Sequence, residues 1–535
     1  MLKKTDIALA LLSGILLVLG FPPFDFYPLA WIALIPLFVS LMEKNAKASF
    51  YLGMLAGFVY FAGTVYWIFN SIYFYGNIPA VLSLLILIAL CLYLGAYVGV
   101  FSVLLNFLSR RSRLPVLFTA PVLWVTLEFL RTYALTGFPW SVLGYSQYKF
   151  LTLIQISDIT GIYGVSFLVA ALNGAIFDVM VYWPKRLSRM PLYGRWQMTI
   201  GLIIFSLIVA VSLFYGMWRL KTVEKGRNLR VSVIQGNFEQ EKKWDAKFKR
   251  QIIDSYKRHT LKASLDYPKL IVWPETSIPF VFGQDEALTA EIREFQKTLD
   301  SYLLFGGVTV KDVSDNKPLS PAAFLRKQEA GGQGKNQIAN SAILMSPDGE
   351  VLSVYDKIHL VPYGEYVPLR NIFPFIKKLV VGVGDFMQGK EYTVTDIPGA
   401  RVSSLICYEI IFPGLVRKFA DKGANLFVTI TNDAWFGRTS APYQHFSMAV
   451  FRAVENRVPV IRAANTGISG FIDARGRIQK KSGIFVEAVL TDDVTLESFN
   501  KSFYSRYGDL FAFLCIISFV LLIANNVYPK KRSTP

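Results

Sequence analysis

Three residues whose side chains could act together in covalent catalysis stand at the ends of apolar runs in the second half of the chain. Cys407 ends the run VSSLIC, Glu275 lies in WPETS just after the run LIVW, and Lys357 lies in YDKIH. A nucleophilic cysteine needs a base that takes its proton and a cation that stabilises the oxyanion formed beside it. A carboxylate and a lysine are candidates for these two roles, so the three residues form a candidate catalytic set.

The cysteine has a simpler interpretation that must be weighed first. The chain has three cysteines, and Cys91 and Cys515 lie in long apolar segments, so Cys407 has no disulfide partner within its own region. A lone cysteine is most often a small buried core residue. The position of Cys407 favours a functional role, because it ends a strand-like run, and side chains at the carboxyl ends of strands in α/β folds face the ligand crevice.

Histidine would be the usual partner of a nucleophilic cysteine, and the chain has only His259, His359 and His445. The absence of an HExxH motif and of paired cysteines argues against a zinc site. His359 stands two residues after Lys357, so a Cys–His pair remains an alternative to the carboxylate and lysine. Taken singly, a glutamate or lysine is most often a solvated or ion-paired surface residue.

The elements that must position these residues are short strand-like runs that alternate with helical patterns. The runs are rich in β-branched residues and have turn signals at their ends. Strands that alternate with helices indicate an α/β domain whose sheets are covered by helices. We expect strands at 229–235, 270–273, 302–307, 341–345, 402–407, 426–430 and 460–464, and helices at 238–265, 285–300, 413–422 and 441–456.

The remainder of the chain is a different kind of polypeptide. The sequence has 535 residues, of which 53% are hydrophobic, and its mean hydropathy is +0.39. These values are too high for a purely soluble protein. A helix of roughly 20 apolar residues crosses a bilayer. We expect about eight such spans, at 7–21, 28–42, 51–71, 80–107, 115–134, 161–183, 198–218 and 508–527. The first resembles a secretory signal, but no small-residue cleavage site follows it, which favours a retained anchor.

Basic residues predict how these spans are oriented. Alternate connecting segments hold 14 lysines and arginines against two acids, and so carry a net +12 of the chain's +18. By the positive-inside rule these segments and both termini are cytoplasmic, which places residues 222–505 on the outer side. This distribution also explains the pI of 9.5 without a nucleic-acid partner. The basic segments are 1–6, 43–49, 108–114, 184–196 and 527–535.

Taken together, WPE, DK and CYE, in this order, resemble the catalytic motifs of the nitrilase (carbon–nitrogen hydrolase) superfamily over roughly 228–495. An outward-facing domain of this kind, inserted between a seventh and an eighth span, is similar to the bacterial apolipoprotein N-acyltransferase family. Further stretches resemble that family: GFPP at 20–23, GFPW at 137–140, GYSQ at 144–147, QGNF at 235–238, YGEYVP at 363–368 and NDAWFG at 432–437.

The resemblance implies roles for individual residues. Cys407 would be the nucleophile, Glu275 the general base and later the general acid, and Lys357 the cation that faces the oxyanion. The backbone N–H of Tyr408 would be a second oxyanion donor, and Glu365 would orient Lys357 or the substrate amine. Trp244, Tyr408, Glu409 and Trp435 match further positions that the family uses around the site, and the two tryptophans have an equally ordinary interpretation as packing residues.

The resemblance also implies a fold and a reaction. We expect a polytopic α-helical membrane domain at 1–221 with seven spans, a periplasmic αββα sandwich at 222–505, and an eighth span with a basic cytoplasmic tail at 506–535. The protein would be a multi-pass enzyme of the bacterial inner membrane. It would transfer an acyl chain from a phospholipid, through a cysteine thioester, to the α-amine of the N-terminal diacylglyceryl-cysteine of an apolipoprotein. The implied protein is a monomer that needs no metal, nucleotide or redox cofactor.

Three alternatives remain at this point. A membrane-anchored amidase or hydrolase of the nitrilase type could use the same residues and pass the acyl group to water, although one span would suffice to anchor it. A transporter or receptor without catalysis has a little support from polar residues within the spans, namely Glu128, Arg131, Asn173 and Asp178, although Glu128 and Arg131 lie at i and i+3 and can pair on one helix. A scaffolding role leaves the combination of Glu275, Lys357 and Cys407 unexplained.

Overall fold

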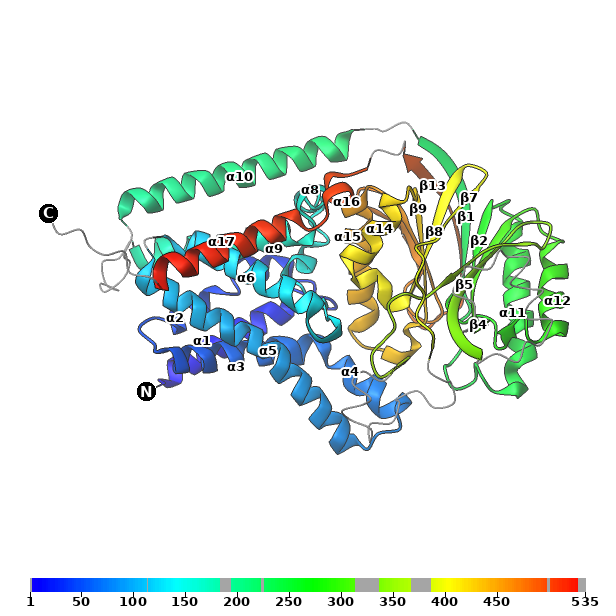
Figure 1. The fold of residues 1–535 in the computed structure, drawn as a ribbon, viewed down its shortest axis with the longest axis horizontal. Coiled ribbons are helices and arrows are strands. Elements are labelled where there is room, and N and C mark those ends of the chain that lie inside the picture. The colour runs from blue at the N-terminus through cyan, green and yellow to red at the C-terminus, as the bar shows by residue number, and fades with distance from the viewer. Residues whose placement is uncertain are drawn as a thin grey trace. The chain divides into compact units, whose positions relative to one another are not determined.

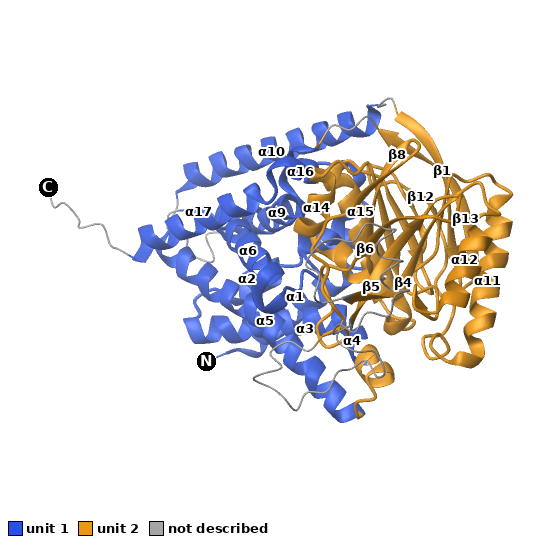
Figure 2. Cartoon of the chain, turned by 45° about the vertical axis from the view of Figure 1, so that its right-hand side comes forward, with its two compact units in different colours: residues 1–69, 80–222, 502–535 blue, residues 70–79, 223–501 orange. Residues whose placement is uncertain are grey.

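The computed structural model describes residues 2–112, 114–182, 194–222, 226–312, 336–366, 386–497 and 501–527. The chain forms two compact units, coloured separately in Figure 2. Unit 1 comprises Met1–Phe69, Ala80–Thr222 and Ser502–Pro535, and unit 2 comprises Asn70–Pro79 and Val223–Lys501. The sequence did not lead us to expect that the short segment Asn70–Pro79, which lies between two hydrophobic helices, groups with unit 2.

Unit 2 contains a first sheet of seven strands in the order β13-β1-β2-β4-β5-β6, with β3 paired to β4. β1, β2 and β4 run parallel to one another, and β13, β5 and β6 pair antiparallel with their neighbours. The strands are β1 (Gly226–Gln235), β2 (Leu270–Val272), β3 (Val281–Phe282), β4 (Tyr302–Asp312), β5 (Asn336–Met345), β6 (Val351–Asp356) and β13 (Ala488–Glu497).

A second sheet has six strands in the order β12-β11-β10-β9-β8-β7. Its central strands β8, β9 and β10 are parallel, and β9 and β10 are buried along their whole length. Strands buried on both faces are apolar throughout, so the sequence shows them as continuous hydrophobic runs. The strands are β7 (Val394–Ile397), β8 (Ala400–Ile406), β9 (Leu426–Thr431), β10 (Val460–Ala464), β11 (Gly470–Ile472) and β12 (Ile478–Lys481).

The two sheets pack face to face through contacts such as those of β1 with β10 and of β5 with β8. Helices α11 (Ala246–Ser264) and α12 (Glu286–Gln296) cover the first sheet, and α14 (Pro413–Asp421) and α15 (Ala441–Asn456) cover the second (Figure 1). Between α11, α12 and the first sheet lies an apolar core that includes Tyr256, Trp273 and Phe305. Unit 2 is therefore an α–β–β–α sandwich.

All seven expected strands are present, and the expected helix at 441–456 has the bounds of α15. The expected helix at 238–265 begins too early, because Asp245 caps α11 by accepting a hydrogen bond from the backbone N–H of Lys247. Residues 240–244 therefore form a turn.

Unit 1 is helical, and each of the eight expected spans coincides with helical structure. By length and composition, five helices of the described residues are able to cross a membrane: α3 (Ala46–Val65), α5 (Ala80–Arg111), α9 (Ile162–Tyr182), α10 (Arg195–Lys221) and α17 (Leu510–Val527). The other expected spans correspond to α1 (Lys4–Leu19), the helices at Tyr27–Trp31 and Ile35–Ser40, and α6 (Val116–Tyr133).

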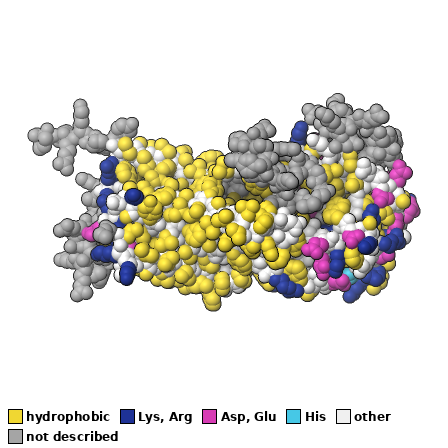
Figure 3. All heavy atoms as spheres, turned by 90° about the horizontal axis from the view of Figure 1, so that it is seen from below, with side chains coloured by type: hydrophobic (Ala, Val, Ile, Leu, Met, Phe, Trp, Pro, Cys, Tyr) yellow, Lys and Arg dark blue, Asp and Glu magenta, His cyan; other side chains and the backbone are white. Residues whose placement is uncertain are grey.

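The surface of unit 1 suits a lipid environment. Large apolar side chains of α5 and α10 are exposed, among them Val81 at 73%, Leu207 at 62% and Phe214 at 70%. On the face shown in Figure 3, hydrophobic side chains cover most of unit 1 and charged side chains lie at one end of it, whereas charged side chains of both signs gather over unit 2. Extended apolar surface of this kind is stable only against other apolar material, so these helices indicate a membrane protein.

The polar residues within the expected spans bond to the backbone of unit 1. Glu128 accepts a hydrogen bond from Leu143 N at 2.7 Å, and Arg131 donates to the carbonyl oxygens of Phe138 and Trp140 at 3.1 and 2.6 Å. Asn173 donates to Ala30 O, and Asp178 accepts from the backbone of α6. Such bonds satisfy backbone groups that lack a partner within a regular helix. They account for these residues without a transport pathway.

Three of the basic segments meet at one end of unit 1. Lys44 forms an ion pair with Asp6 at 2.7 Å, Arg110 donates to the carbonyl oxygen of Lys44, and Arg111 donates to Asn526 O at 3.3 Å. This end is therefore shared by segments 1–6, 43–49 and 108–114 and by the end of α17. The positive-inside rule requires this of basic segments on one side of a membrane. The basic segments 184–196 and 527–535 lie almost entirely outside the described residues.

Candidate active site

Cys407 stands at the point where β8 ends and a 3-10 helix (Cys407–Ile411) begins. Its φ is +51°, which is uncommon for a residue with a Cβ and is found where a sharp turn fixes a side chain. The residue is 7% exposed. Because β8, β9 and β10 are parallel, their carboxyl ends lie at one edge of the sheet, and residues after β9 therefore join Cys407 there.

Glu275, which lies shortly after β2, is held through both carboxylate oxygens. Its Oε1 accepts a hydrogen bond from Asn340 Nδ2 at 2.8 Å, and its Oε2 accepts from the backbone N–H of Asn432, just beyond β9, at 2.9 Å. The side chain is 6% exposed. Two donors from different sheets thus fix the orientation of this carboxylate.

Gly306 of β4 makes room for the backbone around Glu275. A Cβ at Gly306 would lie 2.6 Å from both Glu275 Cα and Thr276 N. Gly306 also donates to Pro274 O at 3.1 Å and accepts from Ser277 N at 2.9 Å. The glycine in the run LLFGGV is therefore required by close backbone approach.

Lys357 lies directly after β6 and is fully buried between two carboxylates. Its Nζ is 2.9 Å from Glu365 Oε1 and 3.6 Å from Glu275 Oε1. Asn340 also donates to Glu365 Oε1 at 2.9 Å, so one amide group joins the two carboxylates. Glu365 in turn accepts from Val361 N at 2.8 Å. These contacts form one cluster, which consists of Lys357, the two glutamates and Asn340.

The electrostatics of this cluster depend on burial and on close charges. Burial disfavours the ammonium of Lys357, but Glu365 and Glu275 outweigh it and raise the pKa of Lys357 above its usual range. Burial and the Glu275 carboxylate raise the pKa of Cys407, and Lys357 partly opposes them. The thiol is therefore protonated at rest, the lysine is charged, and a base must take the thiol proton during any attack.

Glu409 has a structural role beneath the nucleophile. This buried carboxylate accepts hydrogen bonds from Ile406 N at 2.7 Å, from the Tyr355 hydroxyl at 2.7 Å, and from Ile358 N and His359 N at 2.7 and 3.1 Å. It thereby ties the end of β8 to the segment that follows Lys357. Burial raises the pKa of Glu409 to about 7.

Tyr408 is buried, and it is the second residue of the 3-10 helix that Cys407 begins. The N–H groups of a first helical turn have no acceptor within the helix. The N–H of Tyr408 therefore has no acceptor within its own helix, which agrees with the expected role of a second oxyanion donor.

The two predicted tryptophans differ from the rest of the site. Trp244 is 42% exposed. Trp435 lies in the 3-10 helix Asp433–Phe436, and its ring centroid is 5.2 Å from that of Tyr75 in the Asn70–Pro79 segment. The carbonyl oxygen of Trp435 accepts a hydrogen bond from Ser71 at 2.8 Å. Trp435 thus joins this segment to the rest of unit 2, and packing explains its position.

Two residues of the cluster were not predicted from the sequence. Asn340 lies one residue before an expected strand, and its function depends on the pairing of β5 with β4. Lys243 is fully buried and donates to Glu275 O at 2.9 Å and to Thr276 Oγ1 at 3.1 Å. Burial lowers its pKa to about 8. The KKWD turn marks this position, but the resemblance directed attention to the neighbouring Trp244.

The two histidines nearest to Cys407 in the sequence have other partners in this arrangement. His445 Nε2 is 3.2 Å from the carbonyl oxygen of Cys407, and because a carbonyl only accepts, Nε2 carries the proton. Burial and Arg462 lower the pKa of His445. His359 packs on Phe412 with ring centroids 3.8 Å apart, and burial lowers its pKa to about 4.

Comparisons with known proteins agree with this description. Residues 13–175 match the Apolipoprotein N-acyltransferase N-terminal domain, and residues 230–501 match the Carbon-nitrogen hydrolase family. An Apolipoprotein N-acyltransferase of Geobacter metallireducens is 41% identical over 98% of this chain and 95% of its own length. One of Pasteurella multocida is 30% identical over 94% of this chain and 91% of its own.

Among solved structures, an amidase from Nesterenkonia sp. AN1 is similar to this chain at 20% identity and a TM-score of 0.38. The match covers 54% of this chain and 97% of the amidase.

Proposed function

The chain belongs to the apolipoprotein N-acyltransferase family, and we propose that Glu275, Lys357 and Cys407 carry out its reaction in unit 2. The protein is an acyltransferase of lipoprotein maturation. A lipid donates the acyl chain, and an apolipoprotein accepts it. The observation that carries the assignment of residues is the cluster in which Lys357 lies between Glu275 and Glu365.

In the first half-reaction, Glu275 takes the proton of the Cys407 thiol as the sulfur attacks the ester carbonyl of a phospholipid. The S–C bond forms, and the carbonyl oxygen becomes an oxyanion, which Lys357 and the Tyr408 N–H stabilise. The C–O bond then breaks, and Glu275 returns its proton to the departing lysophospholipid. The enzyme is left as a thioester on Cys407, with Glu275 ionised again. Separate donation and acceptance of the acyl group predict ping-pong kinetics.

In the second half-reaction, the α-amine of a diacylglyceryl-cysteine attacks the thioester carbonyl, and Glu275 removes a proton from the amine. The C–N bond forms and the C–S bond breaks. The proton passes from Glu275 to the thiolate of Cys407, which restores the starting state. Asn340 and the Asn432 N–H support these transfers because they hold the Glu275 carboxylate in one orientation through both steps.

The protein is proposed to expose unit 2 on the periplasmic side of the inner membrane, with eight spans and both termini in the cytoplasm. The clustering of basic segments at one end of unit 1 supports this topology. The same reasoning supports three proposed regions, namely a membrane domain at 1–221, a catalytic domain at 222–505 and a final span at 506–535. The proposed enzyme is a monomer, since the catalytic cluster is complete without a residue from a second copy.

A transfer assay tests the proposed reaction. The purified protein is acylated with phospholipid, freed of lipid, and mixed with a peptide that carries an N-terminal diacylglyceryl-cysteine. We expect an N-acylated peptide and loss of the enzyme-bound acyl group, whereas an N-acetylated control peptide should remain unchanged. Release of free fatty acid with no modified peptide would instead show a hydrolase and would contradict the proposal.

A further inference from the structure

Three fully buried polar residues near the nucleophile form a network that the proposed reaction does not use. Arg462 lies in β10, Asp433 follows β9 and His445 lies in α15, and none of the three is exposed to solvent. Arg462 Nη2 donates to Asp433 Oδ2 at 2.8 Å and lies 2.9 Å from His445 Nδ1. Asp433 belongs to the NDAWFG stretch, in which the resemblance gave a role only to Trp435.

The contacts of His445 determine which ring nitrogen carries its proton. A guanidinium is always charged and only donates hydrogen bonds, so Nδ1 of the neutral ring accepts from Arg462. Burial and Arg462 lower the pKa of His445, which keeps the ring neutral. Nδ1 also lies 3.1 Å from Asp433 Oδ1, which accepts a hydrogen bond from the Thr431 hydroxyl at 2.9 Å. The ring proton is therefore on Nε2, which donates to the carbonyl oxygen of Cys407 at 3.2 Å.

The carbonyl group that accepts this bond belongs to the same peptide unit as the N–H of Tyr408. This peptide is trans, and the C=O and N–H of a trans peptide are coplanar and point in opposite directions. A donor that fixes the oxygen therefore also fixes the direction of the N–H. Hydrogen bonds in a chain polarise one another, so a bond to the oxygen strengthens the N–H as a donor. His445 thus acts on the group expected to be the second oxyanion donor.

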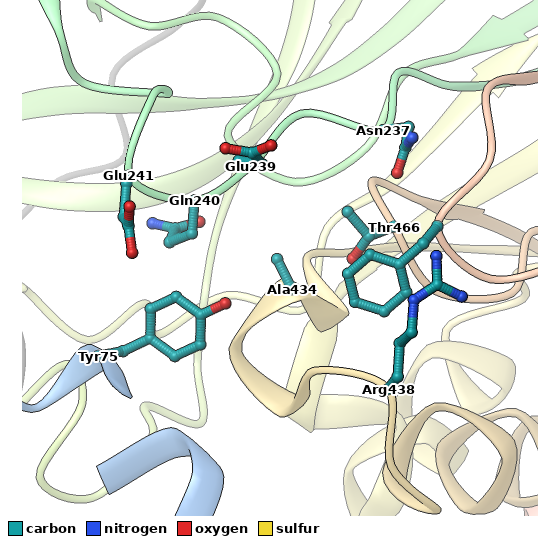
Figure 4. Close-up of a pocket in the computed structure, with 9 residues that line it drawn as sticks. Tyr75, Asn237, Glu239, Gln240, Glu241, Ala434, Arg438 and Thr466 are labelled. Atoms are coloured by element: carbon teal, nitrogen blue, oxygen red, sulfur yellow. The ribbon is translucent and has the colours of Figure 1, made fainter. Parts of the chain in front are cut away.

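The network does not line the space that is open to a ligand. Figure 4 shows a cavity of about 370 Å³, and one of its lining residues is Ala434, which directly follows Asp433. Arg462, Asp433 and His445 are not among the described residues that line this cavity. Any effect of His445 on the reaction is therefore exerted through the peptide that it holds.

The strained backbone at Cys407 gives this hydrogen bond a purpose that stability alone does not supply. A φ of +51° persists only where the surrounding structure holds the residue. Glu409 accepts from the N–H of Ile406 on one side of Cys407, and His445 donates to the carbonyl oxygen on the other. A buried ion pair such as that of Arg462 with Asp433 is often no more stable than apolar residues of the same volume.

Resting on the proposed function, we propose that His445, held by Arg462 and Asp433, is a positioning residue of the oxyanion site. It orients and polarises the Cys407–Tyr408 peptide, whose N–H then stabilises the oxyanion. No bond to His445 forms or breaks, and its proton stays on Nε2. An oxyanion forms when the ester is attacked and again when the thioester is attacked, so His445 contributes to both half-reactions.

Two amide substitutions of His445 isolate this hydrogen bond. The amide of His445→Gln can take the place of Nε2, whereas the shorter side chain of His445→Asn takes the place of Nδ1 and does not reach Cys407. We expect His445→Asn to slow single-turnover acylation about tenfold, and transfer from its acyl-enzyme to the peptide by a similar factor, with the lipid concentration for half-maximal rate unchanged. His445→Gln should recover most of both rates. His445→Phe keeps the ring volume without a donor and should behave like His445→Asn.

Alkylation by iodoacetamide distinguishes this role from a general disturbance of the site. Cys407 is again the nucleophile, but iodide leaves a saturated carbon and no oxyanion forms. In a background without the other two cysteines, the unmodified protein and His445→Asn should be alkylated at the same rate by intact mass. Thermal unfolding checks that each variant is folded. The matched control is His259→Asn in α11, because His259 contacts Ser255 and Glu487, and it should leave all three rates unchanged.

The outcomes separate this inference from the proposed function. If His445→Asn changes alkylation as much as acylation, His445 supports the thiol or the fold, and the inference is overturned. Unchanged acylation, loss of one half-reaction alone, or a His445→Gln rate no higher than that of His445→Asn would also overturn it, and each would leave the proposed function intact. Failure of the unmodified protein to form a thioester would contradict the proposed function, and this inference with it.

Discussion

At the scale of single residues, the central feature is a charged lysine kept between two carboxylates in a buried site. Burial alone would favour the neutral amine, and Glu365 and Glu275 reverse that preference. The pKa of Lys357 therefore depends on Glu365. The charge that would stabilise an oxyanion is set by a neighbour that need not touch the substrate.

This dependence predicts a change in pH profile for Glu365→Gln. In the proposed active form, Lys357 is an ammonium, and its raised pKa keeps it charged throughout pH 7–9.5. Deprotonation of Lys357 should therefore not slow acylation by the unmodified enzyme in that range. Removal of the Glu365 charge lowers the pKa of Lys357, and the rate should then decline as pH rises, by about tenfold per pH unit above the new pKa. Initial acylation rates at fixed lipid concentration measure this. A parallel profile for both proteins would show that Glu365 does not set the charge of Lys357.

Sequence motifs identified Glu275, Lys357 and Cys407 because each residue stands at the end of a hydrophobic run with a distinctive local sequence. Asn340 and Lys243 could not be found in this way. Their hydrogen bonds to Glu275 exist only after β5 has paired with β4 and the turn at 240–244 has packed against the segment that follows β2. Residues that orient a catalytic group from another strand or turn are not marked by a distinctive motif in the sequence around them.

At the scale of elements, the two sheets place Glu275 and Cys407 at strand ends, and close packing between strands holds the site. Gly306 and Gly307 are adjacent in β4, and they provide matched positions for a test of this packing. A Cβ at Gly306 would meet the backbone of Glu275 and Thr276, whereas a Cβ at Gly307 would meet the side-chain end of Ile278 at 2.9 Å.

We therefore expect Gly306→Ala to be much more harmful than Gly307→Ala. Overpacking against backbone should cost about 1–3 kcal/mol of stability and displace Glu275, so that acylation falls by more than the loss of folded protein explains. Gly307→Ala should be milder, because the Ile278 side chain can move. Thermal unfolding and acylation rates of both variants decide the matter. Equal activity in the two variants would show that Gly306 does not hold the position of Glu275.

The strands that sequence reasoning found are the apolar ones. β9 and β10 are buried throughout, and their runs were evident. β12 is exposed along its length and β13 is buried at only a few positions, so neither produced a comparable run. The grouping of Asn70–Pro79 with unit 2 was also missed, because the contact of Tyr75 with Trp435 joins residues far apart in sequence.

At the scale of the whole molecule, the expected topology assigns the basic ends of the helices and unit 2 to opposite sides of the membrane. Hydropathy and charge were sufficient to locate the helices of unit 1, since spans and connecting segments differ so strongly in composition. Length and composition identify five helices of the described residues as able to cross a membrane.

Cysteine labelling tests this topology. Lys47 lies in a basic segment and Lys297 at the end of α12 in unit 2, and both are exposed. In a background without Cys91, Cys407 and Cys515, Lys297→Cys should react with a membrane-impermeant maleimide in intact spheroplasts, and Lys47→Cys should react only after lysis. Labelling of both residues before lysis, or of Lys47→Cys alone, would contradict the proposed orientation.

The central claim is that Cys407 carries the acyl group, and intact-mass spectrometry after incubation with phospholipid alone tests it most directly. We predict a mass increase of one acyl chain, removed by hydroxylamine, on the unmodified protein and none on Cys407→Ala. An adduct that persists in Cys407→Ala, or the absence of both adduct and lysophospholipid with the unmodified protein, would contradict the mechanism.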